Sequence, residues 1–452
     1  MQENKQGFEL INGMVWKVLI KFAFPIFLST IFQVLYTMTD AFIIGQFAGT
    51  DMLAAIDSVY NVIKFPLNFF TGLSSGATII VSQYYGAKDL DKVSEVSHNA
   101  VLFSLCGGLF ISVLGVFLSP FFIDLLNVPK NIAYFSNLYL TIYFIGMSFS
   151  LFYNMGAGII RALGNSKIPF YLLIVSNVIN IVLDLIFIKM FQMGVSGAAL
   201  ATIISQFVCA VLIFFILLKT TLPCKIRITK IHFQGKYIKE IFKLGIPIGM
   251  QFVLFPISNM VVQSSINSFG VDSIAAWAVC GKLDFLIWSV LEALSVAVSV
   301  FVAQNYGAGK YKRVKQGVNF GILTGVVIIG SISFILYFHS MFLASLLIKK
   351  QSAILIVGSI MNFIAPFYVM AVFFEILSSA IRGMGESVRP MIITLITTCF
   401  FRIFWIMFIV PLKSSLFLTL SCYPLSWFIA SISFIVCYLL ILRKDRILHL
   451  SI

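Results

Sequence analysis

The chain has 452 residues, of which 60% are hydrophobic and only 11% charged, and its mean hydropathy is +1.02. A soluble domain carries about 25% charged residues, so this composition excludes a soluble globular protein. The net charge of +14 does not indicate nucleic-acid binding, because the basic residues crowd into short loops between apolar runs. We therefore expect an all-α polytopic membrane protein.

Apolar runs long enough to cross a bilayer, which takes about 20 residues, recur almost from end to end. The twelve predicted spans are 16–46, 53–82, 95–120, 132–152, 168–190, 195–218, 240–268, 274–304, 314–340, 351–380, 388–411 and 416–442. Prolines inside these runs predict kinks, at Pro25, Pro66, Pro247, Pro256 and Pro366.

The loops differ in charge on the two predicted sides of the membrane. Of the 31 basic residues, 23 lie on one side, 5 on the other and 3 inside spans. Basic loops face the cytoplasm, so both termini are expected there, in a multi-pass protein of the plasma (inner) membrane.

Two halves of the chain repeat each other. "VSQYYGAKDLDKV" (81–93) matches "VAQNYGAGKYKRV" (302–314), and "IIRALGNSKIPF" (159–170) matches "AIRGMGESVRPM" (380–391), both at an offset of 221. The offset contains six spans, so the halves cross the membrane in the same direction. This predicts an N-lobe at 1–218, a cytoplasmic linker at 219–239 and a C-lobe at 240–452. The two six-helix lobes would be related by a pseudo-two-fold axis along the membrane normal, as in parallel-repeat transporters.

Two polar stripes interrupt the apolar spans of the first half. Asn177, Asn180 and Asp184 share one helix face. A carboxylate inside a membrane is costly and therefore suggests function, whereas Asn177 alone is better explained as a hydrogen-bonding clip between helices.

The second stripe is formed by Gln33, Thr37 and Asp40. Together the stripes offer two carboxylates and several neutral oxygens, which suit Na⁺ or a proton shared between Asp40 and Asp184.

The second half lacks this constellation, because an offset of 221 places Phe401 and Trp405 opposite Asn180 and Asp184. Its own acid, Glu292, is expected either to attract cationic substrates or to pair with a lysine. Other in-span charges have simpler explanations: Lys282 and Asp284 near the interface, and Glu375 paired with Arg402 across helices.

The sequence contains no motif for nucleotide binding, metal-dependent catalysis or nucleophilic catalysis. The segment "GAGKYK" (307–312) lacks the spacing of a phosphate-binding loop, and no metalloenzyme or nucleophilic pattern is present. We expect no enzymatic activity and no cofactor apart from a coupling ion, H⁺ or Na⁺.

The doubled topology resembles the multidrug and toxic compound extrusion (MATE) family, prokaryotic type. So do "FPIFLSTIFQVLYTMTDAFIIGQFAGTDMLAA", "VSQYYGA", "IIRALGNSKIPF" and "GVSGAALATIISQ". The resemblance implies a cation-coupled antiporter that exports drugs or dyes. It also implies a cation site at Asp40, Asn180 and Asp184, completed by Tyr139 and Thr202.

One branch of that family uses a glutamate shortly after the start of helix seven, whereas the corresponding stretch here, "GIPIGMQFVLFPISN", contains no acid. Glu292 resembles instead the helix-eight acid of small Gram-positive-type exporters. A substrate cavity is accordingly expected at Glu292, Gln33, Thr37 and Asn177.

The expected partners are small organic cations and membrane lipid, with no nucleic acid, and the expected state is a monomer. The alternative function is flipping of lipid-linked oligosaccharides or lipids, which requires a strongly cationic cavity. Only Lys64, Lys282 and Arg402 lie inside spans, which argues against it. A scaffold without transport is the third possibility.

Overall fold

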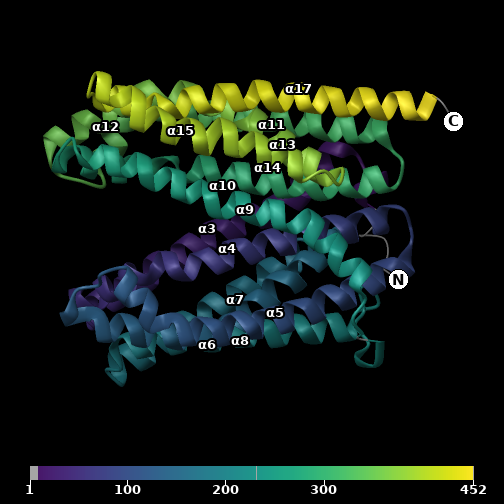
Figure 1. The fold of residues 1–452 in the computed structure, drawn as a ribbon, viewed down its shortest axis with the longest axis horizontal. Coiled ribbons are helices and arrows are strands. Elements are labelled where there is room, and N and C mark those ends of the chain that lie inside the picture. The colour runs from purple at the N-terminus through teal and green to yellow at the C-terminus, as the bar shows by residue number, and fades with distance from the viewer. Residues whose placement is uncertain (1–8, 231, 451–452) are drawn as a thin grey trace. The chain divides into compact units, whose positions relative to one another are not determined.

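The computed structural model describes residues 9–230 and 232–450, and almost all of them are helical (Figure 1). The earlier helices are α2 (Glu9–Asn12), α3 (Val15–Phe47), α4 (Thr50–Gly86), α5 (Leu90–Leu125), α6 (Lys130–Ala162), α7 (Lys167–Asp184) and α8 (Gly194–Lys219). The later ones are α9 (Gly235–Asn267), α10 (Val271–Gly307), α11 (Tyr311–Ser345), α12 (Gln351–Ile364), α13 (Tyr368–Gly383), α14 (Val388–Thr394), α15 (Phe401–Phe404), α16 (Leu416–Leu420) and α17 (Cys422–Leu450).

Each predicted span coincides with one long helix or with consecutive helical segments. Within the described residues, eleven of these are long and apolar enough to cross a membrane. The long helix outside that set is α4, which carries Asp51, Asp57 and Lys64. The all-α multi-pass fold is thus confirmed, and the helices mostly run further than predicted, as at Ala162 in α6.

The chain divides into two compact units, which are described separately. Residues 20–249 make up most of the first unit and residues from 250 onward most of the second, so the division falls inside α9. The predicted lobe and linker boundaries stay a prediction.

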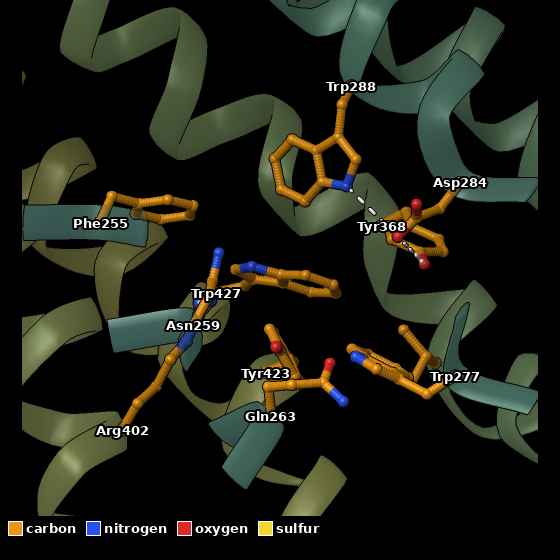
Figure 2. Close-up of a pocket in the computed structure, with 11 residues that line it drawn as sticks. Phe255, Asn259, Gln263, Trp277, Asp284, Trp288, Tyr368, Arg402, Tyr423 and Trp427 are labelled. Carbon is orange, nitrogen blue, oxygen red and sulfur yellow. Dashed lines mark hydrogen bonds between the residues drawn. The ribbon is translucent and has the colours of Figure 1, made fainter. Parts of the chain in front are cut away.

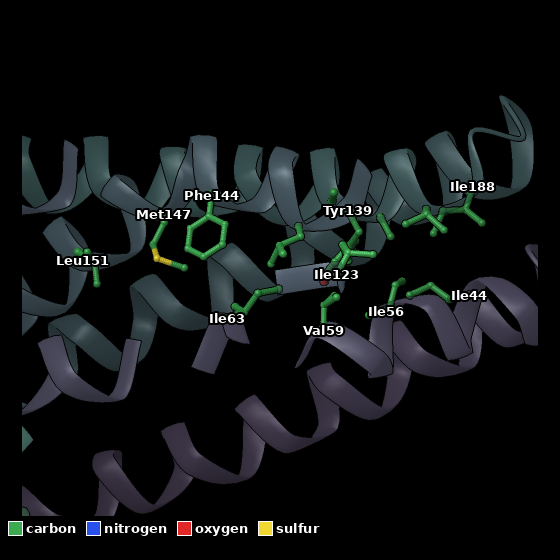
Figure 3. Close-up of a cluster of buried hydrophobic side chains, with 14 of the residues drawn as sticks. Ile44, Ile56, Val59, Ile63, Ile123, Tyr139, Phe144, Met147, Leu151 and Ile188 are labelled. Carbon is green, nitrogen blue, oxygen red and sulfur yellow. The ribbon is translucent and has the colours of Figure 1, made fainter. Parts of the chain in front are cut away.

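Helix α6 is central to the first unit, where it packs against α4, α5 and α8. Figure 3 shows buried side chains of the hydrophobic cluster that joins these helices to α3, among them Ile44 of α3, Val59 and Phe144. Tyr139 and Ile188 belong to the same hydrophobic cluster. This cluster therefore fixes the helices that bear the predicted cation ligands.

The segment between α8 and α9 packs against α5. His98 Nε2 accepts a hydrogen bond from the Arg227 backbone N–H at 2.9 Å, and Asn99 Oδ1 accepts one from the Gln234 backbone N–H at 2.8 Å. Cys224 is fully buried, and that burial raises the pKa of its thiol to about 12. Much of this polar segment is thus anchored in the first unit.

Helix α4 and the first half of α9 approach each other at glycines. A Cβ atom on Gly72 would lie 2.2 Å from the backbone nitrogen of Gly249, and one on Gly76 would lie 2.6 Å from that of Gly245. The neighbouring atoms are backbone, which cannot move aside as a flexible side chain can. Glycine is therefore required where these helices cross.

We predict that Gly72→Ala lowers the free energy of unfolding by about 1–3 kcal/mol or more, because the added methyl group forces the helices apart. Thermal unfolding of the purified protein in detergent measures this. Gly281→Ala is the matched control, since its Cβ would meet nothing within 4 Å and alanine favours a helix. Equal melting temperatures for the two variants would contradict the packing described.

Candidate cation site in the first unit

The predicted cation ligands come together from four helices of the first unit. They are Asp40 on α3, Tyr139 on α6, Asn180 and Asp184 on α7, and Thr202 on α8. Helix α7 packs against α8, and α8 against α6. Asp40 of one predicted stripe and Asp184 of the other thus face a common centre.

Two carboxylates define this centre. Asp184 is 0% exposed and Asn180 is 1% exposed, whereas Asp40 is half-buried. The carboxylates of Asp40 and Asp184 are close enough to interact with each other directly. None of the ion pairs in the described part of the chain includes either residue. The site therefore concentrates negative charge without a compensating basic side chain.

The polar atoms of this centre lack partners. Five of the buried atoms that make no hydrogen bond within the described residues belong to this centre: Asp40 Oδ1, Asn180 Oδ1 and Nδ2, and both Asp184 carboxylate oxygens. Buried polar groups in native proteins are nearly always satisfied, so such a cluster calls for a ligand. Four of the five atoms are oxygens, which is the donor type that a small hard cation prefers.

Hydroxyl groups surround the carboxylates. Thr202 Oγ1 donates to the Ala198 carbonyl at 3.0 Å and lies 3.5 Å from the Tyr36 hydroxyl. Tyr36, Tyr139 and Tyr143 all interact electrostatically with Asp40.

Tyr36 and Tyr143 were not among the ligands predicted from the sequence. Each stands four residues from a predicted ligand, Asp40 and Tyr139 respectively, and therefore shares its helix face. This four-residue spacing could have identified both tyrosines from the sequence as neighbours of the site.

The residues predicted to line a substrate cavity are placed differently. Gln33 and Thr37 are exposed on α3, and the Thr37 hydroxyl donates to the Gln33 carbonyl at 3.0 Å. Asn177 Nδ2 donates to the Phe32 carbonyl at 3.2 Å and so clips α7 to α3. Glu292 is exposed on α10, in the second unit. The assignment of these four residues to a substrate cavity stays a prediction.

The residue of the second unit that corresponds to Asp184 in the repeat has a hydrogen-bonded polar group. Asp184 is followed by a π-helix at Leu185–Met190, and a π-helix also begins at Trp405, its counterpart in the repeat. The Trp405 indole N–H donates to the Leu418 carbonyl at 2.8 Å. The π-helix is therefore common to both halves, whereas the unsatisfied carboxylate is specific to the first.

A MatE family model matches the chain twice, at residues 25–186 and 247–407. Together the matches cover more than half of the chain, and their ends lie 221 residues apart, which is the offset of the sequence motifs, while their starts lie 222 apart. The chain belongs to the multidrug and toxic compound extrusion (MATE) family. It is therefore a multi-pass membrane protein of a transporter family.

Curated relatives agree with this assignment over most of their length. The chain is 29% identical to the probable multidrug resistance protein YpnP of Bacillus subtilis over 405 residues, and this alignment covers 89% of the chain and 88% of the relative. It is 28% identical to the probable multidrug resistance protein YoeA of the same organism, with 84% of each covered. The multidrug export protein MepA of Staphylococcus saprophyticus is 24% identical, with 72% of each covered.

Solved structures share the fold. A transporter of the MOP superfamily from Pyrococcus furiosus has a TM-score of 0.89 and 20% identity, with 99% of each chain covered. A MATE transporter from Vibrio cholerae has a TM-score of 0.88 and 19% identity, with 95% of this chain and 97% of the other covered.

We predict that Asp184→Asn raises the free energy of unfolding by about 1–3 kcal/mol, because it removes a buried charge that nothing in the protein compensates. The melting temperature in detergent, in an alkaline buffer without Na⁺ so that the carboxylate is ionised, measures this effect. Asp124→Asn makes the same chemical change at an exposed position on α5 and should leave the melting temperature unchanged. Lower stability in Asp184→Asn would mean that the carboxylate has a structural partner.

Proposed function

We propose that the protein is a secondary multidrug exporter, which moves organic cations or amphipathic compounds out of the cell in exchange for H⁺ or Na⁺. The coupling ion binds at Asp40, Asn180 and Asp184, with Tyr139 and Thr202 as neighbouring ligands. The protein acts as a monomer in the plasma membrane with both termini in the cytoplasm.

The single observation that carries this proposal is the cluster of five unsatisfied buried atoms on Asp40, Asn180 and Asp184. A proton would neutralise one of two repelling carboxylates and supply a hydrogen-bond donor between them. A sodium ion would instead be coordinated by the carboxylate, amide and hydroxyl oxygens. Either ion removes the electrostatic penalty that the two carboxylates, when both are ionised, impose on the folded state.

The multidrug character is supported by the relatives, which are named for drug resistance or drug export. The first unit gives a means of coupling. Asp40 lies on the same helix as Pro25, whose carbonyl accepts the Ser29 hydroxyl at 2.8 Å. Binding of a cation at Asp40 and Asp184 draws α3 and α7 together, and a proline is a point at which α3 can bend.

The driving force follows from charge. A cation that enters from outside and leaves into the cytoplasm releases about 2.3 kcal/mol per net charge for each 100 mV of membrane potential. Alternating access of the two lobes would make the release of drug outside conditional on that binding step.

Ethidium transport in proteoliposomes tests the proposal. With an imposed H⁺ gradient or an imposed Na⁺ gradient, we expect one of the two to drive ethidium movement by the wild type. Asp184→Asn should reduce this movement to the level of protein-free liposomes, because the variant cannot exchange a charge. Asp124→Asn, at an exposed carboxylate, should transport as the wild type does.

Normal ethidium transport by Asp184→Asn would overturn the assignment of the site. Absence of ethidium transport under both gradients, together with gradient-independent movement of fluorescent lipid, would instead favour a flippase.

The coupling ion can be identified without transport. A ligand that binds the folded state raises its melting temperature as its concentration increases. If Na⁺ is the ion, the melting temperature of the wild type should rise more with NaCl than with KCl at equal ionic strength, and Asp184→Asn should abolish the difference. Identical curves for the two salts in the wild type would leave H⁺ as the coupling ion.

A further inference from the structure

The second unit contains a separate cavity of about 320 Å³, a size suited to a small ligand (Figure 2). Six aromatic side chains line it: Phe255, Trp277, Trp288, Tyr368, Tyr423 and Trp427. These residues come from α9, α10, α13 and α17, so the cavity depends on the packed unit rather than on one helix. None of them belongs to the cation site of the first unit.

The aromatic rings form a continuous wall around Trp427. The centre of that ring lies 5.3 Å from Tyr368, 5.9 Å from Tyr423 and 6.1 Å from Trp288. Trp277 extends the wall, with its ring 5.4 Å from that of Tyr423. Such a wall offers ring faces both to a flat aromatic group and to a cation.

One charged group of the cavity is acidic. Asp284 Oδ2 accepts the Tyr368 hydroxyl at 3.0 Å and the Trp288 indole N–H at 3.4 Å. Both donors are neutral, and no ion pair of the described residues includes Asp284. The sequence suggested an interfacial position for this residue, whereas the structure places it in the cavity wall.

The other charged group is basic. Arg402 is 1% exposed, its Nε donates to Ser426 Oγ at 3.1 Å, and its Nη1 donates to Asn259 Oδ1 at 2.8 Å. The guanidinium also lies 4.4 Å from the centre of the Tyr423 ring. All of these partners are neutral.

The predicted ion pair of Arg402 with Glu375 is wrong. Glu375 interacts electrostatically with Arg382 instead, and no ion pair of the described residues includes Arg402. The positive charge of Arg402 is therefore buried without a counter-charge among the contacts described.

Two hydrogen-bond donors in this cavity are unused. Within the described residues, Arg402 Nη2 and the Trp427 indole N–H are buried and have no acceptor. An unpaired buried donor costs about 1–3 kcal/mol, more when it is charged. A planar anionic group, such as a carboxylate, would satisfy both the charge and the donors.

We propose that this cavity binds aromatic zwitterions. The carboxylate of the ligand would pair with Arg402, its ammonium group with Asp284, and its aromatic body would lie against Trp427 and Tyr423. Figure 2 shows Asp284 and Arg402 on opposite sides of the view, with those two aromatic residues between them. As the assignment of a substrate class, the inference rests on the proposed export function, although binding itself requires no transport.

Three ligands that share one aromatic body test the proposal. The first is an aminomethyl-biphenyl carboxylate, with its amine and carboxylate at opposite ends; the second is its methyl ester, a cation; the third is its N-acetyl derivative, an anion. Binding to the protein in detergent is followed by quenching of tryptophan fluorescence, since three of the five tryptophans line the cavity, and is checked by calorimetry. We expect the wild type to bind the zwitterion at least about tenfold more tightly than either derivative.

The variants should separate the two ends of the ligand. Arg402→Gln should weaken binding of the zwitterion and of the N-acetyl derivative but not of the ester, whereas Arg402→Lys should retain the preference for the zwitterion. Asp284→Asn should weaken binding of the zwitterion and of the ester but not of the N-acetyl derivative. Arg389→Gln and Asp124→Asn, at exposed positions, are the matched controls.

Equal affinity of the wild type for all three ligands, or no binding of any, would overturn the proposal, and neither result depends on a variant that folds. The proposal would also be overturned if Arg402→Gln or Asp284→Asn weakened the binding of all three ligands equally. Ethidium transport is measured separately, so a failure here does not affect the export proposal, and the reverse also holds.

Discussion

Burying a carboxylate among apolar helices costs at least about 2.5–3.5 kcal/mol, and a second carboxylate beside it adds repulsion. In the first unit this free-energy cost applies to Asp40 and Asp184. Neither residue has a basic partner among the described residues, and three of their four carboxylate oxygens make no hydrogen bond. Its helices are positioned by a hydrophobic cluster that includes Tyr139 and Ile188, next to the polar centre. Packing elsewhere in the unit thus holds together a group of atoms that would otherwise separate.

The two units handle buried polarity differently. Where the first unit has Asp184, the second has Trp405, whose N–H is bonded to a carbonyl group. The second unit has its own charges, Asp284 and Arg402, held apart by aromatic side chains and hydrogen-bonded only to neutral groups. The duplicated fold therefore carries two different candidate sites, one that we propose for a small ion and one that we propose for a larger ligand with two charges. This division of labour fits a transporter that must bind an ion and a substrate.

Much of the fold could be predicted from the sequence, because membrane spans are read from length and hydropathy and the repeat is visible at a fixed offset. Asn180 and Asp184 stood out through helical periodicity, since polar residues are rare in such segments. Tyr139 and Thr202 could be named only through the family resemblance. Tyr36 and Tyr143 were missed because a tyrosine is common in this chain, which has 16, and its position becomes informative only beside a known ligand.

The rest depends on tertiary contacts that no local pattern encodes. The crossing at Gly72 and Gly249 joins residues far apart in the sequence, and glycine is frequent in membrane helices for other reasons. The cavity around Trp427 requires six separate helical segments to meet, namely α9, α10, α12, α13, α15 and α17. Arg402 donates hydrogen bonds to two neutral partners and does not pair with Glu375, as the sequence had suggested. That prediction was wrong because the sequence shows that two opposite charges lie in different spans but not whether their helix faces meet.

The most direct test of the central claim is an infrared difference spectrum of the purified protein, recorded between acidic and alkaline buffer, with and without Na⁺. A cation site at Asp40 and Asp184 predicts a protonated carboxyl band that is lost at alkaline pH or on addition of Na⁺, and that is missing from both Asp40→Asn and Asp184→Asn. The same band in the wild type and in both variants would contradict the account, because the titrating carboxyl would then lie elsewhere.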